Sequence, residues 1–129
     1  MGQKYLIDTN VISDLFSNKL PKPGKAFVKK VINNEFIISI VVKIEVLTNH
    51  ELPEKFVQIK EFIGLAKVLA LDETVAEKTI LLRHEFRKLQ LGDAIIAATA
   101  LVYNLTLITR NTSDFKNIKG LHVLNAHAL

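Results

Sequence analysis

Residues 92–104 read GDAIIAATALVYN, and LTLIT follows directly at positions 105–109. The first stretch is apolar almost all round and rich in alanine, which predicts a buried helix packed closely on a sheet and ending near Asn104. The second stretch is a short apolar run of strand length. A buried helix that leads directly into a buried strand is typical of α/β proteins, so this block predicts an α/β fold.

Four further runs have the length and composition of strands. They are KYLI (4–7), FIIS (36–39), KVLAL (67–71) and LHVL (121–124). Longer segments with helical spacing separate most of them, and this alternation favours a mostly parallel sheet covered by helices on both faces. One such segment, residues 72–88, begins with Asp72 as a possible helix cap. Its buried face is predicted to consist of Val75, Thr79, Leu82 and Phe86.

The 129 residues are 49% apolar and 23% charged, and they include no cysteine. This composition excludes a disordered chain, a disulfide framework and a thiolate metal site. No apolar run approaches the ~20 residues of a membrane span and no signal peptide is evident, so we expect no membrane partner and a cytoplasmic protein. The breaks around Pro21, Pro23 and Gly24 and at Pro53 predict loops rather than domain linkers. We therefore expect a single domain over residues 1–129.

Four acidic residues stand close to the predicted strand ends. Asp8 directly follows the first strand, Glu45 comes shortly after the second, and Asp114 follows the fourth. Asp93 opens the buried helix that packs beside them. Because the carboxyl ends of parallel strands meet at one rim of a sheet, we expect all four carboxylates to converge there.

Four ionised carboxylates at close range repel one another strongly or take up protons, and a divalent cation removes that conflict. Oxygen ligands without cysteine, and with no histidine at zinc-ligand spacing, favour Mg²⁺ or Mn²⁺ over Zn²⁺. Mg²⁺ retains several waters and binds phosphate oxygens readily. The acids therefore indicate metal-assisted phosphodiester chemistry.

Each acid also has an ordinary structural interpretation. Asp8 or Asp93 could cap the helix that follows it. Glu45 could pair with Lys43, and Asp114 could form an Asx turn. Convergence of the four side chains in space separates these interpretations from a shared site.

The remaining titratable residues are assigned ordinary roles. Asp14, on the predicted first helix, is expected at the surface. The histidines are expected to be incidental: His50, His84, His122 and His127. Basic residues that could bind RNA phosphates, or equally be solvated, are Lys22, Lys25, Lys29, Lys30, Arg83, Arg87, Lys88 and Arg110.

Four stretches of the chain match a known family. LIDTNVI, SIVVKIEV, LGDAIIAATALVYNLTLITRNTSDF and GLHVLN resemble the PIN-domain ribonucleases in order and spacing, over nearly the whole chain. Within that family the chain is similar to the VapC-like toxins of type II toxin–antitoxin systems. The resemblance implies a PIN-like three-layer α/β fold, with a five-stranded parallel sheet of order 3-2-1-4-5 between helices.

The resemblance also assigns roles to residues at the motif positions. It implies metal-binding and catalytic roles for Asp8, Glu45, Asp93 and Asp114, and supporting polar roles for Thr9, Asn10, Ser39, Thr109 and Asn111. One position departs from the family pattern, because Val42 stands where a threonine often precedes the glutamate. A supporting hydroxyl beside Glu45 is therefore expected to be missing.

The function implied by the resemblance is Mg²⁺- or Mn²⁺-dependent endoribonuclease activity, with RNA as substrate and a cognate antitoxin and a second copy of the chain as partners. The apolar segment FVQIKEFIGLAKV (56–68) agrees with a protein partner, since one small domain does not easily bury it. One alternative is a catalytically inactive PIN-type module that binds RNA or protein. Another is an aspartyl-phosphate phosphotransferase, which position 10 disfavours because it is asparagine where that chemistry needs a second aspartate.

Overall fold

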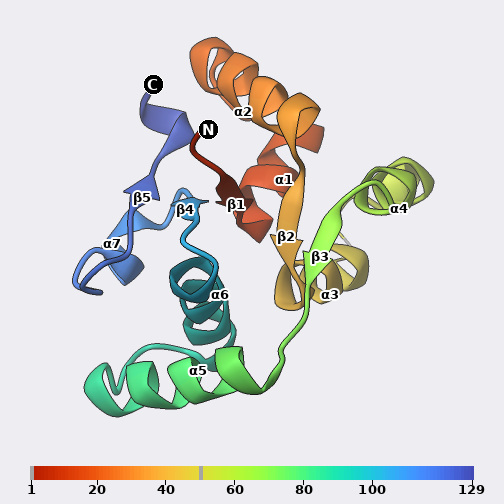
Figure 1. The fold of residues 1–129 in the computed structure, drawn as a ribbon. Coiled ribbons are helices and arrows are strands. Elements are labelled where there is room, and N and C mark those ends of the chain that lie inside the picture. Colours follow the sequence, from red (N-terminus) through yellow and green to blue (C-terminus); the bar gives the residue numbers. More distant parts are fainter. Residues whose placement is uncertain (1, 50) are drawn as a thin grey trace.

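A computed structural model describes residues 2–49 and 51–129 (Figure 1). The strands are short, and each leads into or out of a helix. They are β1 (Tyr5–Ile7), β2 (Ile37–Ser39), β3 (Lys67–Leu69), β4 (Thr106–Ile108) and β5 (Val123–Leu124). All of them fall within the runs that the sequence predicted.

The strands pair only in parallel, as the alternation of strand and helix predicted. Hydrogen bonds form a three-stranded sheet of order β1-β4-β5 and a two-stranded sheet of β2 and β3. β1 and β2 lie side by side (Figure 1), but no ladder joins them in the part of the chain that the structure describes. The expected single five-stranded sheet of order 3-2-1-4-5 is therefore wrong. Each strand has three residues at most, and Ser39 turns directly into the next helix, which leaves little backbone for a further ladder.

Seven α-helices and two short 3₁₀ helices are found in residues 2–49 and 51–129. They are α1 (Thr9–Phe16), α2 (Lys22–Asn34), α3 (Ile40–Thr48), η1 (Pro53–Lys55), α4 (Phe56–Ile63), α5 (Glu73–Glu85), α6 (Leu91–Val102), α7 (Thr112–Phe115) and η2 (Ala126–Ala128). α6 packs against α5 and contacts β4, while α1 packs against α3. None of the helices described is long and apolar enough to cross a membrane.

The central helix and its neighbour follow the predicted pattern. In α6, residues 94–100 are all buried, and the chain leaves the helix through Asn104, whose φ of 54° is in the left-handed region. Asparagine tolerates that conformation better than most residues, so it ends the helix as predicted. In α5, the Asp72 carboxylate caps the helix by accepting a hydrogen bond from the Val75 N–H at 2.9 Å.

The loop predicted around Pro21, Pro23 and Gly24 is only partly correct, because α2 begins at Lys22. Proline is well tolerated in the first turn of a helix, where its missing N–H has no partner to lose. Gly24 lies in that first turn, where a Cβ would stand 1.9 Å from the carbonyl oxygen of Ala126. Glycine therefore allows the C-terminal helix η2 to pack directly on the backbone of α2.

Candidate active site

Asp8 is the first residue after β1 and the N-cap of α1, and it is 4% exposed. Its Oδ1 accepts the Thr9 N–H at 2.8 Å. Its Oδ2 accepts the Thr109 hydroxyl at 2.8 Å and the Asn10 amide at 3.3 Å. Burial raises the pKa of Asp8 and the Glu45 charge adds to this, although these hydrogen bonds oppose the shift. Asp8 thus caps its helix, and its carboxylate is also repelled by the negative charge of Glu45.

Glu45 lies on the exposed side of α3 but is held by α1. The Thr9 hydroxyl donates to Glu45 Oε1 at 2.6 Å, and a Cβ on Gly92 would lie 3.8 Å from Oε2. Val42 is fully buried in the core, so its side chain belongs to the packing of α3. The hydroxyl that we expected to be missing is therefore supplied from α1. The described contacts include no ion pair between Glu45 and Lys43.

Asp93 is the third residue of α6, whose N-cap is Gln90. The interpretation of Asp93 as a helix cap is therefore wrong. Its pKa is raised to about 6, first by burial and then by the negative charges of Asp8, Asp114 and Glu45. An effect of all three acids on one carboxyl group shows that the four side chains share one region of space.

Asp114 lies in the short helix α7, where its N–H donates to the carbonyl of Asn111, so it is exposed on a helix rather than in an Asx turn. Two cavities connect it to the other acids. One is lined by residues that include Asp8, Glu45, Asp93 and Asn111, and the other by residues that include Asp93, Asn111 and Asp114. Because Asp93 and Asn111 line both, we describe them together as the acidic groove. It contains the four predicted acids, Asp8, Glu45, Asp93 and Asp114, and its first cavity is lined by Asp14 and Glu51 as well.

The predicted supporting residues hold Asp8 and Glu45 in different ways. Asn10 donates to Thr109 at 3.2 Å as well as to Asp8, and Thr109 also accepts the Asn111 N–H at 3.1 Å. Ser39, in contrast, caps α3 by accepting the Val42 N–H at 3.2 Å. This hydrogen bond to Ser39 stabilises the start of α3. Thr9, Asn10 and Thr109 instead donate hydrogen bonds to the acids themselves.

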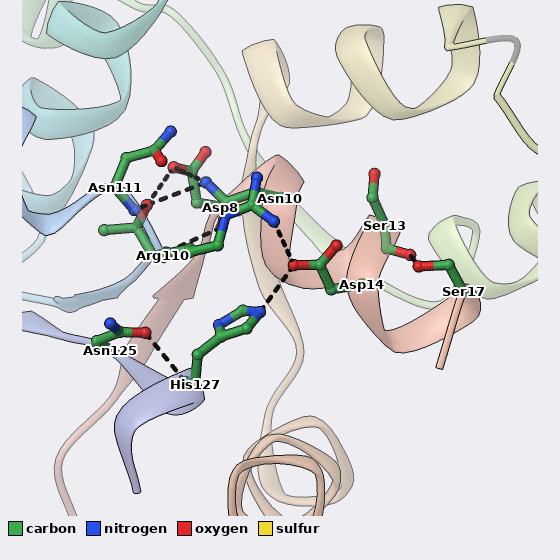
Figure 2. A network of polar contacts seen from close by, with 10 residues as sticks. Asp8, Asn10, Ser13, Asp14, Ser17, Arg110, Asn111, Asn125 and His127 are labelled. Carbon is green, nitrogen blue, oxygen red and sulfur yellow. Dashed lines mark hydrogen bonds and ion pairs between the residues drawn. The ribbon is translucent and has the colours of Figure 1, made fainter. Parts of the chain in front are cut away.

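Asp14 and His127 depart from the sequence predictions. Asp14 is 6% exposed rather than at the surface, and its Oδ2 lies 2.7 Å from both Arg110 Nη1 and His127 Nε2 (Figure 2). His127 is therefore not incidental. No local signal links Asp14 to its partners, since Arg110 and His127 lie 96 and 113 positions from it in the chain. His84 and His122 are exposed, and His50 lies outside the described residues.

The side chains of the acidic groove have the chemistry of a site for a divalent cation. All anionic groups of the groove are carboxylates. They repel one another, and a bound cation would reduce that repulsion. In residues 2–49 and 51–129, however, no three His, Cys, Asp or Glu side chains are arranged to hold an ion. The groove therefore fits a hard divalent cation in the chemistry and charge of its side chains, although the described geometry does not bring three of them within reach of one ion.

The comparison with known families gives the same picture as the motifs. A model of the PIN domain matches residues 5–121. The chain belongs to the PIN-domain family. This PIN domain is 28% identical over 132 residues to Ribonuclease VapC1 of Rickettsia felis, a match that covers 92% of this chain and 93% of that protein.

Solved structures are also similar to this PIN domain. A toxin–antitoxin complex from Klebsiella pneumoniae has a chain that is 31% identical, with a TM-score of 0.76 and coverage of 95% of this chain and 98% of that one. VapBC2 from Rickettsia felis, bound to a promoter DNA fragment, matches with a TM-score of 0.80 at 20% identity and the same coverage, which shows the fold alone. The expectation of a VapC-like PIN domain is confirmed.

Proposed function

We propose that this PIN domain, over residues 1–129, is a Mg²⁺- or Mn²⁺-dependent endoribonuclease that cleaves RNA in the cytoplasm. It acts as the toxin of a toxin–antitoxin pair, as its VapC-like relatives suggest. The observation that carries the proposal is that Asp8, Glu45, Asp93 and Asp114 all line the acidic groove, and the raised pKa of Asp93 agrees with this arrangement. Such an arrangement destabilises the protein and has an evident use only when a cation is bound.

Asp8, Glu45, Asp93 and Asp114 would hold the ion. When bound, a divalent cation of this kind makes water a better nucleophile and neutralises charge on the leaving oxygen of a phosphodiester. The contribution of the chain is to orient the carboxylates: Thr109 and Asn10 fix Asp8, and Thr9 fixes Glu45. The basic side chains of Arg87 and Lys88 at one end of the groove would bind RNA phosphates.

The proposed partners are a cognate antitoxin and a second copy of the chain. In the segment 56–68, Ile59 and Ile63 are buried, but Val57 and Leu65 are 67% and 79% exposed. A second apolar pair, Ile80 and Leu81, is exposed on α5. Apolar side chains grouped in this way are typical of protein interfaces.

The activity is tested with purified protein and a labelled single-stranded RNA in Mg²⁺ or Mn²⁺. We expect wild type to cleave the RNA, and Glu45→Gln, which keeps the side-chain shape but removes one charge, to cleave it at least ~100-fold more slowly. Binding of RNA without cleavage by wild type in either cation would instead support the inactive binding module.

Thr9→Val is expected to lower the cleavage rate roughly 10-fold, because the isosteric side chain cannot donate to Glu45. The melting temperature should change little, since Thr9 is only partly buried and its backbone is unaffected. Thr9→Ser, which restores a hydroxyl, is the matched control and should recover most of the rate. Equal activity of Thr9→Val and wild type would show that the Thr9–Glu45 contact has no role in catalysis.

A further inference from the structure

One carboxylate oxygen of Asp14 accepts hydrogen bonds from two side chains. Its Oδ2 accepts a hydrogen bond from the guanidinium of Arg110 and another from the imidazole of His127, each at 2.7 Å. The three residues come from α1, from the segment between β4 and α7, and from η2 (Figure 2). A buried carboxylate in such contacts binds strongly, because charge-assisted hydrogen bonds gain strength where water is excluded.

Arg110 is fixed at its backbone as well as at its side chain. Its N–H donates to Asn10 Oδ1 at 2.9 Å, and Asn10 in turn donates to Asp8. The side chain lines the same cavity as Asp8, Glu45 and Asp93, and it is 50% exposed. Among the described residues, the hydrogen bond that the guanidinium makes is the one from Nη1 to Asp14. Its other N–H groups are left for a ligand in the groove.

His127 is held in one orientation from the opposite side of Asp14. The contact requires a proton on Nε2, because an ionised carboxylate can only accept. The close packing of η2 on Gly24 and the hydrogen bond from the His127 N–H to Asn125 Oδ1 at 3.0 Å fix the backbone there. The Asp14 carboxylate therefore lies between Arg110 and His127 of the 3₁₀ helix η2, and hydrogen bonds to both hold it there.

We propose that Arg110 binds an RNA phosphate beside the acidic groove, and that Asp14 and His127 are positioning residues that aim its guanidinium. The inference rests on the proposed function for its substrate. An RNA strand must enter a groove lined by several carboxylates, so a cation fixed next to them offsets part of the repulsion. A guanidinium suits this role, since it stays charged and presents paired N–H groups to phosphate oxygens.

The first test measures RNA binding and cleavage by Arg110→Gln. Binding of a labelled single-stranded oligoribonucleotide is followed by fluorescence anisotropy in Ca²⁺ at several salt concentrations. We expect about 10-fold weaker binding and a slope of log affinity against log salt that is smaller by about 0.7, the value for one lost phosphate contact. KM should rise with kcat changing much less. Lys119→Gln, which removes an exposed charge between α7 and β5, is the matched control and should leave the slope unchanged.

The second test separates positioning from simple charge removal. Asp14→Asn makes the region less negative, so electrostatics alone predicts tighter RNA binding, whereas loss of positioning predicts weaker binding by roughly fivefold. In an Arg110→Gln background, Asp14→Asn should have no further effect on KM. His127→Gln, which keeps an N–H donor, should be closer to wild type than His127→Leu. Melting curves establish that each variant is folded.

Tighter binding by Asp14→Asn, or an equal rise of KM in both backgrounds, would overturn the positioning role. An unchanged salt slope in Arg110→Gln would overturn the phosphate contact. These results are independent of the proposed activity, because anisotropy in Ca²⁺ requires no cleavage. If wild type fails to cleave RNA but the slope still falls in Arg110→Gln, the proposed function is wrong and the phosphate site stands.

Discussion

Asp93→Asn is expected to lose at least ~100-fold of the RNA-cleaving activity, as removal of a preorganised charge commonly does. The substitution keeps the size of the side chain and removes one of the four charges of the acidic groove. It costs no helix cap, because the N-cap of α6 is Gln90. A large loss of activity would therefore report on the groove rather than on the helix.

The same variant should melt higher than wild type in EDTA at neutral pH. Burial and three neighbouring charges raise the pKa of Asp93 from 3.8 to about 6, so ionising it opposes folding. A carboxyl group with a raised pKa contributes most to stability below about pH 4, and that contribution is lost as the pH rises through about 6. The advantage of Asp93→Asn should thus be largest above pH 6 and shrink towards pH 4. Melting temperatures measured across this range check the sign.

Asp72→Asn is the matched control, since Asp72 caps α5 and asparagine is a near-equal cap. It should retain wild-type cleavage. Retained cleavage in Asp93→Asn, together with a melting profile parallel to that of wild type, would refute a shared site of four carboxylates.

Removal of divalent cations should reduce wild-type cleavage to background, and Mg²⁺ or Mn²⁺ should restore it without Zn²⁺. All anionic groups of the acidic groove are carboxylates, which favour hard cations. Ion binding should also raise the melting temperature, by an amount equivalent to roughly 2.7 kcal/mol at 100 times the dissociation constant. Cleavage assays and melting curves over a Mg²⁺ titration measure both effects.

Asp93→Asn serves again as the comparison for the metal titration, because it should bind the ion more weakly and show a smaller rise in melting temperature. Cleavage that persists in EDTA would exclude a metal-dependent mechanism. A melting temperature that rises equally in wild type and Asp93→Asn would mean that the cation binds elsewhere on the protein.

Local patterns in the sequence predicted the strands and the central helix of this PIN domain. Short apolar runs predicted all five strands, and the alanine-rich stretch predicted α6, because burial and backbone preference act on neighbouring residues. Three acids follow strands and Asp93 opens the buried helix, which predicted that all four would meet at one rim, since parallel strands end there. In the structure, Asp8, Glu45 and Asp93 line one cavity, and Asp93 and Asp114 line the other. The departure at Val42 was also visible in the sequence, but its consequence was not.

Contacts between distant segments were decided only by the tertiary structure. β1 and β2 lie side by side without a hydrogen-bonded ladder in the part of the chain described. This depends on how their helices place the three-residue strands, and no local sequence pattern determines that placement. The hydroxyl that supports Glu45 comes from Thr9, 36 positions earlier, and the partners of Asp14 come from the far end of the chain. The sequence around Asp14 does not indicate whether its carboxylate is exposed to water or bound to a guanidinium. Its burial is determined by packing, and only the folded chain brings Arg110 and His127 to Asp14.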